Sequence, residues 1–152
     1  MRALVQRSLK SFVSIKEKKV GEIEHGLVVF VGFTSFDTLE DIDYIVKKII
    51  NLRIFDDENG IMNKSILDVS GAVLSISQFT LYANTKKGNR PSYNEALKAS
   101  EASKFYELFN KKLSEYVPLQ TGVFGEEMLV SIQNDGPVTI LLESRGYYER
   151  KN

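Results

Sequence analysis

Residues 26–33 read GLVVFVGF, an unbroken apolar run, which predicts a strand buried in the core. The hydrophobic period then changes to helical spacing, and Asp37 or Thr38 can cap the start of a helix there. The apolar residues at that spacing are Ile42, Ile45, Val46, Ile49 and Ile50. We therefore expect a buried strand followed by an amphipathic helix over about residues 38–52.

Shorter strands are expected on both sides of this unit, because alternating apolar segments are bounded there by turn residues. A strong hairpin-turn signal, Asn59-Gly60, separates the last two of them. The four segments are RALVQR (2–7), SFVSI (11–15), LRIF (52–55) and IMNK (61–64).

The second half of the chain repeats the change of period. GAVLSISQFTLY (71–82) alternates like one long strand, which would place Gln78 and Thr80 on the same face. A second amphipathic helix is expected over about residues 100–116, with Ser100 as its cap.

The last two predicted strands are EMLVSIQ (127–133) and VTILLE (138–143), so NDGPVT (134–139) between them looks like a hairpin turn. The order of strands, helix, strands, helix and strands indicates an α+β fold, a mostly antiparallel sheet or barrel with two covering helices. We expect a single domain over residues 1–145 and a C-terminal tail over residues 146–152 that is partly ordered at best.

Composition excludes several classes of protein. Cysteine is absent, which removes disulfides, thiolate zinc sites and cysteine nucleophiles, and the one histidine, His25, lies in the turn-like EHG. The 20 basic and 20 acidic side chains give no net charge that would indicate generic nucleic-acid binding. No apolar run is long enough for a signal peptide or a membrane span. We expect a cytoplasmic protein with no metal, no cofactor and no membrane partner.

Two stretches do not fit an ordinary sheet. In SISQFTL the apolar strand face turns polar at Gln78 and Thr80, beside Ser77, which a strand running out to a sheet edge would explain. In NDGPVT, Pro137 lacks the N–H that a returning strand would use. This proline indicates either a bulge that protects a sheet edge or a backbone shape that serves a ligand.

Together, SQFTL at 77–81 and NDGPVT at 134–139 resemble the two signature motifs of the D-aminoacyl-tRNA deacylases. A related editing family, which acts on misacylated L-alanyl-tRNA, departs within both motifs, whereas Ser77, Phe79, Asn134 and Val138 follow the D-specific pattern. The resemblance covers about residues 1–143, through the further matches VQR (5–7), GLVVFVG (26–32), RIF (53–55), KGNRPSY (87–93) and QTGVFG (120–125).

The resemblance implies hydrolysis of the ester that joins a D-amino acid to the 3′-terminal adenosine of tRNA, with some activity on glycyl-tRNA. In the family, a cis Gly-Pro element from one subunit enters the active site of its partner. Here that element is Gly136 and Pro137, so the resemblance also implies a homodimer. Arg7 and Asn134 would support this element, although Arg7 could equally be an ordinary surface arginine.

The resemblance also implies which residues meet the substrate. Phe124 and Met128 match positions around the terminal adenine, with core packing as the alternative for both. The residues expected to line the ester site are Ser77, Gln78, Phe79 and Thr80. The residues expected to contact the acceptor end of tRNA are Lys86, Lys87 and Arg90.

Thr80 is a possible nucleophile by residue type, but neither motif contains a histidine that could activate it. The resemblance favours attack by water with help from the 2′-hydroxyl of the terminal adenosine. Backbone N–H groups around Phe79 and Thr80 would then stabilise the oxyanion. Two alternatives remain: a deacylase of relaxed chirality acting on glycyl- or L-alanyl-tRNA, and an RNA-binding β-domain that recognises acceptor ends without hydrolysis.

Overall fold

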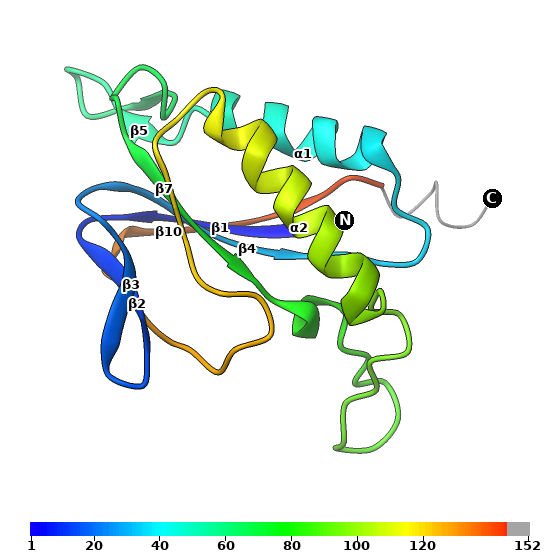
Figure 1. Ribbon diagram of the computed structural model, residues 1–152. Helices are drawn as coiled ribbons and strands as arrows, with labels where there is room; N and C mark the ends of the chain where they lie inside the picture. Colours follow the sequence, from blue (N-terminus) through cyan, green and yellow to red (C-terminus); the bar gives the residue numbers. More distant parts are fainter. Residues whose placement is uncertain (146–152) are drawn as a thin grey trace.

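The computed structural model describes residues 1–145, and its centre is a five-stranded sheet in the order β10-β1-β4-β7-β8 (Figure 1). The strands of this sheet are β1 (Arg2–Ser8), β4 (Gly26–Gly32), β7 (Ala72–Ser77), β8 (Leu119–Thr121) and β10 (Asn134–Glu143). A three-stranded sheet contains β2 (Ser11–Ile15), β3 (Lys18–Ile23) and β9 (Leu129–Ser131). A two-stranded sheet contains β5 (Phe55–Asp56) and β6 (Met62–Lys64). The helices are α1 (Leu39–Asn51) and α2 (Ala99–Ser114), and a 3₁₀ turn, η1 (Phe79–Tyr82), follows β7.

The α+β architecture agrees with the sequence-based expectation, and β4 explains why it could be predicted. Both α-helices cover one face of the five-stranded sheet (Figure 1). Leu27, Val29 and Val31 of β4 are buried in the core cluster beneath these helices. Val28 belongs to a second buried cluster, which Val13 and Ile23 share from the three-stranded sheet. Because β4 is covered on both faces, its sequence is apolar throughout rather than alternating.

Helix α1 forms where the periodicity predicted it. Its five apolar positions from Ile42 to Ile50 are all buried against the sheet. Thr38 is the N-cap, and its N–H donates to Oδ2 of Asp41 over 2.7 Å, which closes the first turn as a capping box does.

The predicted strand over residues 71–82 is too long. Strand β7 ends at Ser77, and residues 79–82 form the turn η1, so Gln78 and Thr80 do not share a strand face. The N–H of Gln78 still donates to the Val31 carbonyl over 2.7 Å, after which the chain crosses the end of β4. Gly32 permits this crossing, since a Cβ there would lie 2.8 Å from the Gln78 carbonyl oxygen.

The prediction that NDGPVT forms a hairpin turn is also wrong. Strand β9 pairs with β2 in the three-stranded sheet, whereas β10 pairs with β1 at the edge of the five-stranded sheet. Asn134 pairs with Ser8 and Thr139 pairs with Gln6, so four residues of β10 lie opposite Arg7 alone. Pro137 therefore occupies a β-bulge on an edge strand, where a missing N–H breaks no ladder.

Smaller differences concern the element ends. Helix α2 starts at Ala99 with Lys98 as its N-cap, so Ser100 lies inside the first turn rather than capping it. Strands β3 and β8 were not predicted, and the pairs β4–β7 and β7–β8 are parallel within the otherwise antiparallel sheet. The hairpin around Gly60 forms, but β5 and β6 are shorter than expected.

No helix within residues 1–145 is long and apolar enough to cross a membrane. The predicted tail, residues 146–152, lies outside the described residues.

Candidate active site

A cavity of about 680 Å³ opens where the parallel strands β4 and β7 end. Its walls come from four parts of the chain: the end of β4, the residues after β7, the segment leading into α2, and the loop between β8 and β9. The lining residues are Val31, Gly32, Phe33, Ile76, Ser77, Gln78, Phe79, Tyr93, Ala96, Leu97, Ala99, Ala102, Phe124, Gly125, Glu126, Glu127, Met128 and Val130. This cavity brings together residues up to about a hundred positions apart in the sequence.

Three of the four predicted ester-site residues, Ser77, Gln78 and Phe79, line the cavity. Thr80 does not line it, but the side chain of Gln78 donates from Nε2 to Oγ1 of Thr80 over 2.6 Å. Phe79 is 55% exposed, and its ring meets that of Tyr93 edge-on with 5.0 Å between the centroids. The polar groups and an exposed aromatic pair thus share one wall.

The turn η1 begins at this wall, where Phe79 lines the cavity. Its first internal hydrogen bond runs from the Leu81 N–H to the Gln78 carbonyl over 3.3 Å. The N–H groups of Phe79 and Thr80 precede that bond, so the turn itself does not use them. Two adjacent unused N–H groups can stabilise an oxyanion that forms beside them.

The one histidine is far from this cavity. His25 precedes β4, whereas the cavity lies at the other end of that strand, roughly 20 Å away at the usual rise per residue. The carboxylates at the cavity are Glu126 and Glu127, both exposed. Among residues 1–145, no group of three or more histidine, aspartate or glutamate side chains is placed to hold a metal ion.

Phe124 and Met128 line the same cavity as Ser77 and Gln78. The ring of Phe124 packs against Tyr106 at 6.1 Å between the centroids, and the Tyr106 hydroxyl donates to the Ser75 carbonyl over 2.7 Å. Burial raises the pKa of Tyr106, so its hydroxyl stays protonated and keeps this bond. An aromatic and a thioether side chain therefore form an apolar wall that can take a flat base.

Sequence reasoning missed the segment between η1 and α2, which supplies Tyr93, Ala96 and Leu97 to the cavity. Phe33 holds this segment through its carbonyl, which accepts from the Leu97 N–H over 2.9 Å. The signal that could have found it was the matched stretch KGNRPSY at 87–93, which ends at Tyr93.

The Gly136–Pro137 peptide bond is cis, and both residues are exposed. Arg7, itself only 9% exposed, donates from Nε to the Asp135 carbonyl over 3.1 Å and from Nη1 to the Ile54 carbonyl over 2.9 Å. Arg7 thus joins the bulge to the chain that follows α1, and it is a buried residue rather than a surface arginine.

Asn134 closes the same bulge from within. Its Oδ1 accepts from the Val138 N–H over 3.2 Å, and its Nδ2 donates to Oγ1 of Thr139 over 2.9 Å. Three residues, Asp135, Gly136 and Pro137, lie between Asn134 and Val138, and Gly136 and Pro137 are exposed.

The two motifs lie at opposite ends of the five-stranded sheet (Figure 1). Strand pairing aligns Asn134 with Ser8, then Gly26, then Ala72, whereas Ser77 is five residues further along β7 beside Val31. The two motifs are therefore separated by three inter-strand spacings across the sheet and by four to five residues along the strands, which together amount to roughly 20 Å. Gly136 and Pro137 do not line the cavity of their own chain.

The predicted tRNA contacts lie outside the cavity. Lys86, Lys87 and Arg90 are exposed in a loop that starts just after η1. Two hydrogen bonds between Asn84 and Ser92, of 2.8 and 2.9 Å, close the base of this loop. Lys86, Lys87 and Arg90 do not line the cavity, whereas Tyr93, just beyond this loop, does.

Known proteins match this chain over nearly its whole length. A family model described as D-Tyr-tRNA(Tyr) deacylase matches residues 4–143. The chain is 53% identical to a D-aminoacyl-tRNA deacylase of Clostridium novyi (strain NT) over 146 residues, which is 95% of this chain and 98% of that protein.

Two solved structures share the fold. One, described as c-Myc DNA Unwinding Element Binding Protein, superposes with a TM-score of 0.92 at 40% identity, over 96% of this chain and 100% of the other. The second, described as a probable eukaryotic D-amino acid tRNA deacylase, has a TM-score of 0.81 at 16% identity, over 93% and 98% of the two chains.

Proposed function

Because the chain belongs to the D-Tyr-tRNA(Tyr) deacylase family and is a D-aminoacyl-tRNA deacylase, we propose that two copies of it build each active site. The observation that carries this proposal is the separation of the two motifs, roughly 20 Å apart in one chain by strand spacing. One copy would supply the cavity with Ser77, Gln78 and Phe79, and the other would supply Gly136 and Pro137. A twofold-symmetric homodimer then has two such sites.

In this proposal the exposed Gly-Pro backbone is the chirality filter. Main-chain groups of Gly136 and Pro137 would hydrogen-bond the α-amino group and fill the space that an L side chain needs. A D side chain would point to solvent, so the enzyme could accept many D-amino acids without a side-chain pocket, which would narrow the range. Arg7 and Asn134 support the filter because they fix the bulge on both sides of it.

The chemistry we propose uses water as the nucleophile. Water attacks the ester carbonyl carbon while the 2′-hydroxyl of the terminal adenosine assists, and the N–H groups of Phe79 and Thr80 bind the oxyanion. The bond from the carbonyl carbon to the 3′-oxygen then breaks, which releases the D-amino acid and the tRNA. Oγ1 of Thr80 accepts from Gln78 and has no histidine near it, so it is poorly placed to act as a nucleophile.

The cavity and the loop beside it would bind the tRNA part of the substrate. The terminal adenine would pack against Phe124 and Met128, and the phosphates of the acceptor end would meet Lys86, Lys87 and Arg90. Since glycine has no side chain for the filter to exclude, glycyl-tRNA should also be hydrolysed. A protein that acts on aminoacyl-tRNA would work in the cytoplasm.

The deciding experiment compares D-tyrosyl-tRNA, L-tyrosyl-tRNA and glycyl-tRNA as substrates of the purified protein. We expect rapid release from the D-ester and from glycyl-tRNA, and a rate near that of spontaneous hydrolysis for the L-ester. Equal rates on both tyrosyl esters would overturn the chirality filter. Binding of tRNA without any ester cleavage would favour an RNA-binding domain instead.

A further inference from the structure

Arg2, the first residue of β1, reaches across the sheet to the turn that follows the cavity residues. Its Nη1 donates to the Leu81 carbonyl over 2.7 Å, and its guanidinium carbon lies 4.6 Å from the centre of the Tyr82 ring. Both contacts are on η1, the turn that also carries Phe79 and Thr80. No sequence motif singled out this arginine.

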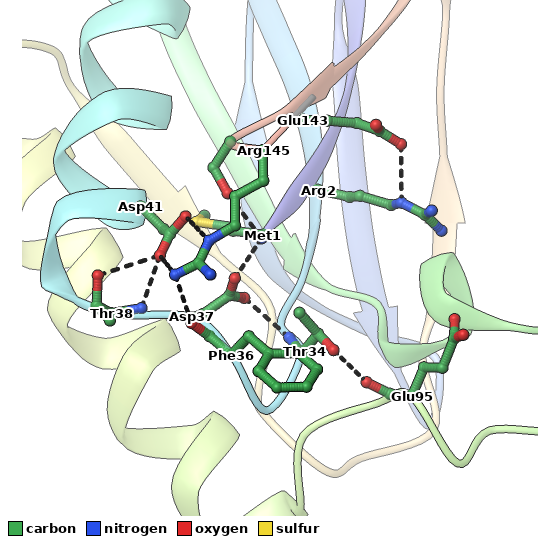
Figure 2. Close-up of polar contacts among 11 residues, drawn as sticks. Met1, Arg2, Thr34, Phe36, Asp37, Thr38, Asp41, Glu95, Glu143 and Arg145 are labelled. Atoms are coloured by element: carbon green, nitrogen blue, oxygen red, sulfur yellow. Dashed lines mark hydrogen bonds and ion pairs between the residues drawn. The ribbon is translucent and has the colours of Figure 1, made fainter. Parts of the chain in front are cut away.

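Arg2 is itself held in place. Its Nε pairs with Oε1 of Glu143 at the end of β10 over 3.0 Å (Figure 2). Arg2 and Glu143 are direct partners in the β1–β10 ladder, and the Arg2 side chain is 21% exposed. Because Nε and Nη1 bind two different partners and the side chain is largely buried, Arg2 has less freedom than an arginine in a surface ion pair.

The turn η1 has only four residues, so it forms few hydrogen bonds of its own and depends on contacts from outside. The Leu81 N–H donates to the Gln78 carbonyl over 3.3 Å, and the Ala83 N–H donates to the Thr80 carbonyl over 3.0 Å. The Leu81 carbonyl lies at the end of the turn, where a helix leaves carbonyls without partners of its own. Gly32, the partner of Arg2 in β4, lies beneath the turn, where a Cβ would be 3.2 Å from that of Leu81. Gly32 thus leaves room for the turn to pack on β4, and Arg2 stabilises the end of the turn through its hydrogen bond to the Leu81 carbonyl.

We propose that Arg2 is a positioning residue for ester hydrolysis. By fixing Leu81 and Tyr82 it holds the preceding N–H groups of Phe79 and Thr80, together with the Gln78 side chain, at the place where the oxyanion forms. Small displacements of such donors cost much of the rate, because they must fit the transition state rather than the bound ester. The inference rests on the site assigned under the proposed function.

Lysine cannot replace arginine in this role. The two contacts on Leu81 and Glu143 use different nitrogens of one planar guanidinium, and its central carbon lies over the Tyr82 ring. The ammonium of lysine is a point charge, which can keep the ion pair with Glu143 or bind the Leu81 carbonyl but does not reproduce all three contacts. Arg2→Lys therefore keeps the charge and removes the geometry.

The test measures kcat and KM of Arg2→Lys on D-tyrosyl-tRNA, with Glu143→Gln as a second variant and Arg53→Lys as the matched control. Arg53 contacts Asn63 over 3.2 Å at an exposed position and does not line the cavity. We expect kcat of Arg2→Lys to fall about tenfold with KM within about twofold of wild type, because a donor misplacement acts on the transition state. Glu143→Gln should show a smaller loss of the same kind, and Arg53→Lys none.

A readout independent of activity separates this inference from the proposed function. The amide NMR signals of Phe79, Thr80 and Leu81 should shift in Arg2→Lys and stay unchanged in Arg53→Lys. Unchanged signals and an unchanged kcat would overturn the role of Arg2, as would a rate loss that only follows a lower melting temperature. If the wild-type protein fails to distinguish D- from L-tyrosyl-tRNA while the amide signals still shift, the proposed function fails and the contact between Arg2 and the turn stands.

Discussion

At the scale of single residues, two arginines of β1 make the same kind of contact at opposite ends of one strand. Arg7 donates to the Asp135 carbonyl beside the Gly-Pro bulge, and Arg2 donates to the Leu81 carbonyl in η1. In both cases a charged donor binds a backbone oxygen in an irregular segment that has few hydrogen bonds of its own. The segments expected to meet the substrate are therefore held by long side chains from a regular strand.

Gly136→Ala should abolish most of the activity. Gly136 has φ +127°, a conformation that other residues avoid, and a Cβ there would lie 2.8 Å from Cγ2 of Val138 and 3.0 Å from Nη2 of Arg7. Strain of about 1–3 kcal/mol should move the bulge and its arginine. We expect kcat/KM on D-tyrosyl-tRNA to fall by about 100-fold or more, since the filter must fit the transition state closely.

The control for this substitution is Gly60→Ala. Gly60 also has a positive φ, +75°, but no atom lies within 4 Å of the added Cβ. This variant should lose some stability and keep its kcat/KM. A Gly136→Ala protein that remains as active as Gly60→Ala would contradict the role given to the bulge.

Thr80→Ala should keep most of the activity, within about threefold of wild type, because a hydroxyl without an adjacent base is a weak nucleophile. Oγ1 of Thr80 accepts from Gln78 over 2.6 Å, so its loss affects orientation of that amide more than bond making. The same assay with tRNA ending in 2′-deoxyadenosine should show almost no cleavage. A folded Thr80→Ala protein that binds tRNA and is inactive would show that the hydroxyl takes part in the reaction.

At the scale of elements, helix α1 is fastened to the end of the described chain. Arg145 binds Asp41 of the first turn of α1 through two bonds of 3.1 Å, from Nε to Oδ1 and from Nη2 to Oδ2 (Figure 2). Burial acts to raise the pKa of Asp41, but hydrogen bonds from Arg145, Ser144 and Thr38 outweigh it and hold the pKa well below its usual range. The start of α1 therefore depends on a charged carboxylate.

Asp41→Asn should destabilise the protein near neutral pH and matter less in acid. A carboxyl with a lowered folded-state pKa stabilises the fold above its unfolded-state pKa, 3.8, and this contribution is lost as the pH falls below that value toward the folded-state pKa. Urea unfolding of wild type and variant at pH 7 and near pH 3 tests this. We expect a gap of about 1–3 kcal/mol at pH 7 that narrows in acid, whereas a gap independent of pH would contradict it.

At the scale of the whole molecule, the topology keeps the two motifs apart. Strands β1 and β4 lie between β10 and β7, so no local movement within one chain can bring Gly136 to Gln78. In the proposed homodimer, a second copy of the chain would provide the missing half of the site without any change in the fold. Shared sites of this kind are also the reason to expect activity to depend on the oligomer.

Subunit mixing tests the shared site directly. Gly136→Ala impairs only the filter and Gln78→Ala impairs only the cavity, so each homodimer should be inactive. After unfolding and refolding of a 1:1 mixture, half of the dimers would be mixed, each with one intact site and one doubly altered site. We expect about a quarter of the wild-type activity to return in the mixture. No recovery, with mixed dimers present by mass spectrometry, would mean that each chain forms its own site.

The sequence by itself determined the features that depend on local order. The apolar run of β4 and the spacing of Ile42 to Ile50 predicted a buried strand and helix α1 almost to the residue, because burial on both faces and helical periodicity leave a pattern within one short segment. The absence of cysteine excluded thiol chemistry, the position of His25 left both motifs without a histidine base, and the two motifs indicated the family.

Only the tertiary structure decided where those motifs lie. The pattern of residues 71–82 could not show that β7 ends at Ser77, since the end depends on Gly32 letting the chain cross β4. Nor could NDGPVT reveal that it belongs to β10 beside β1, because the residues of a strand do not show which segment more than a hundred positions away it pairs with. The cavity has the same origin: contacts between distant segments, rather than the residues of one stretch, place Ser77 beside Phe124 and keep both far from Pro137.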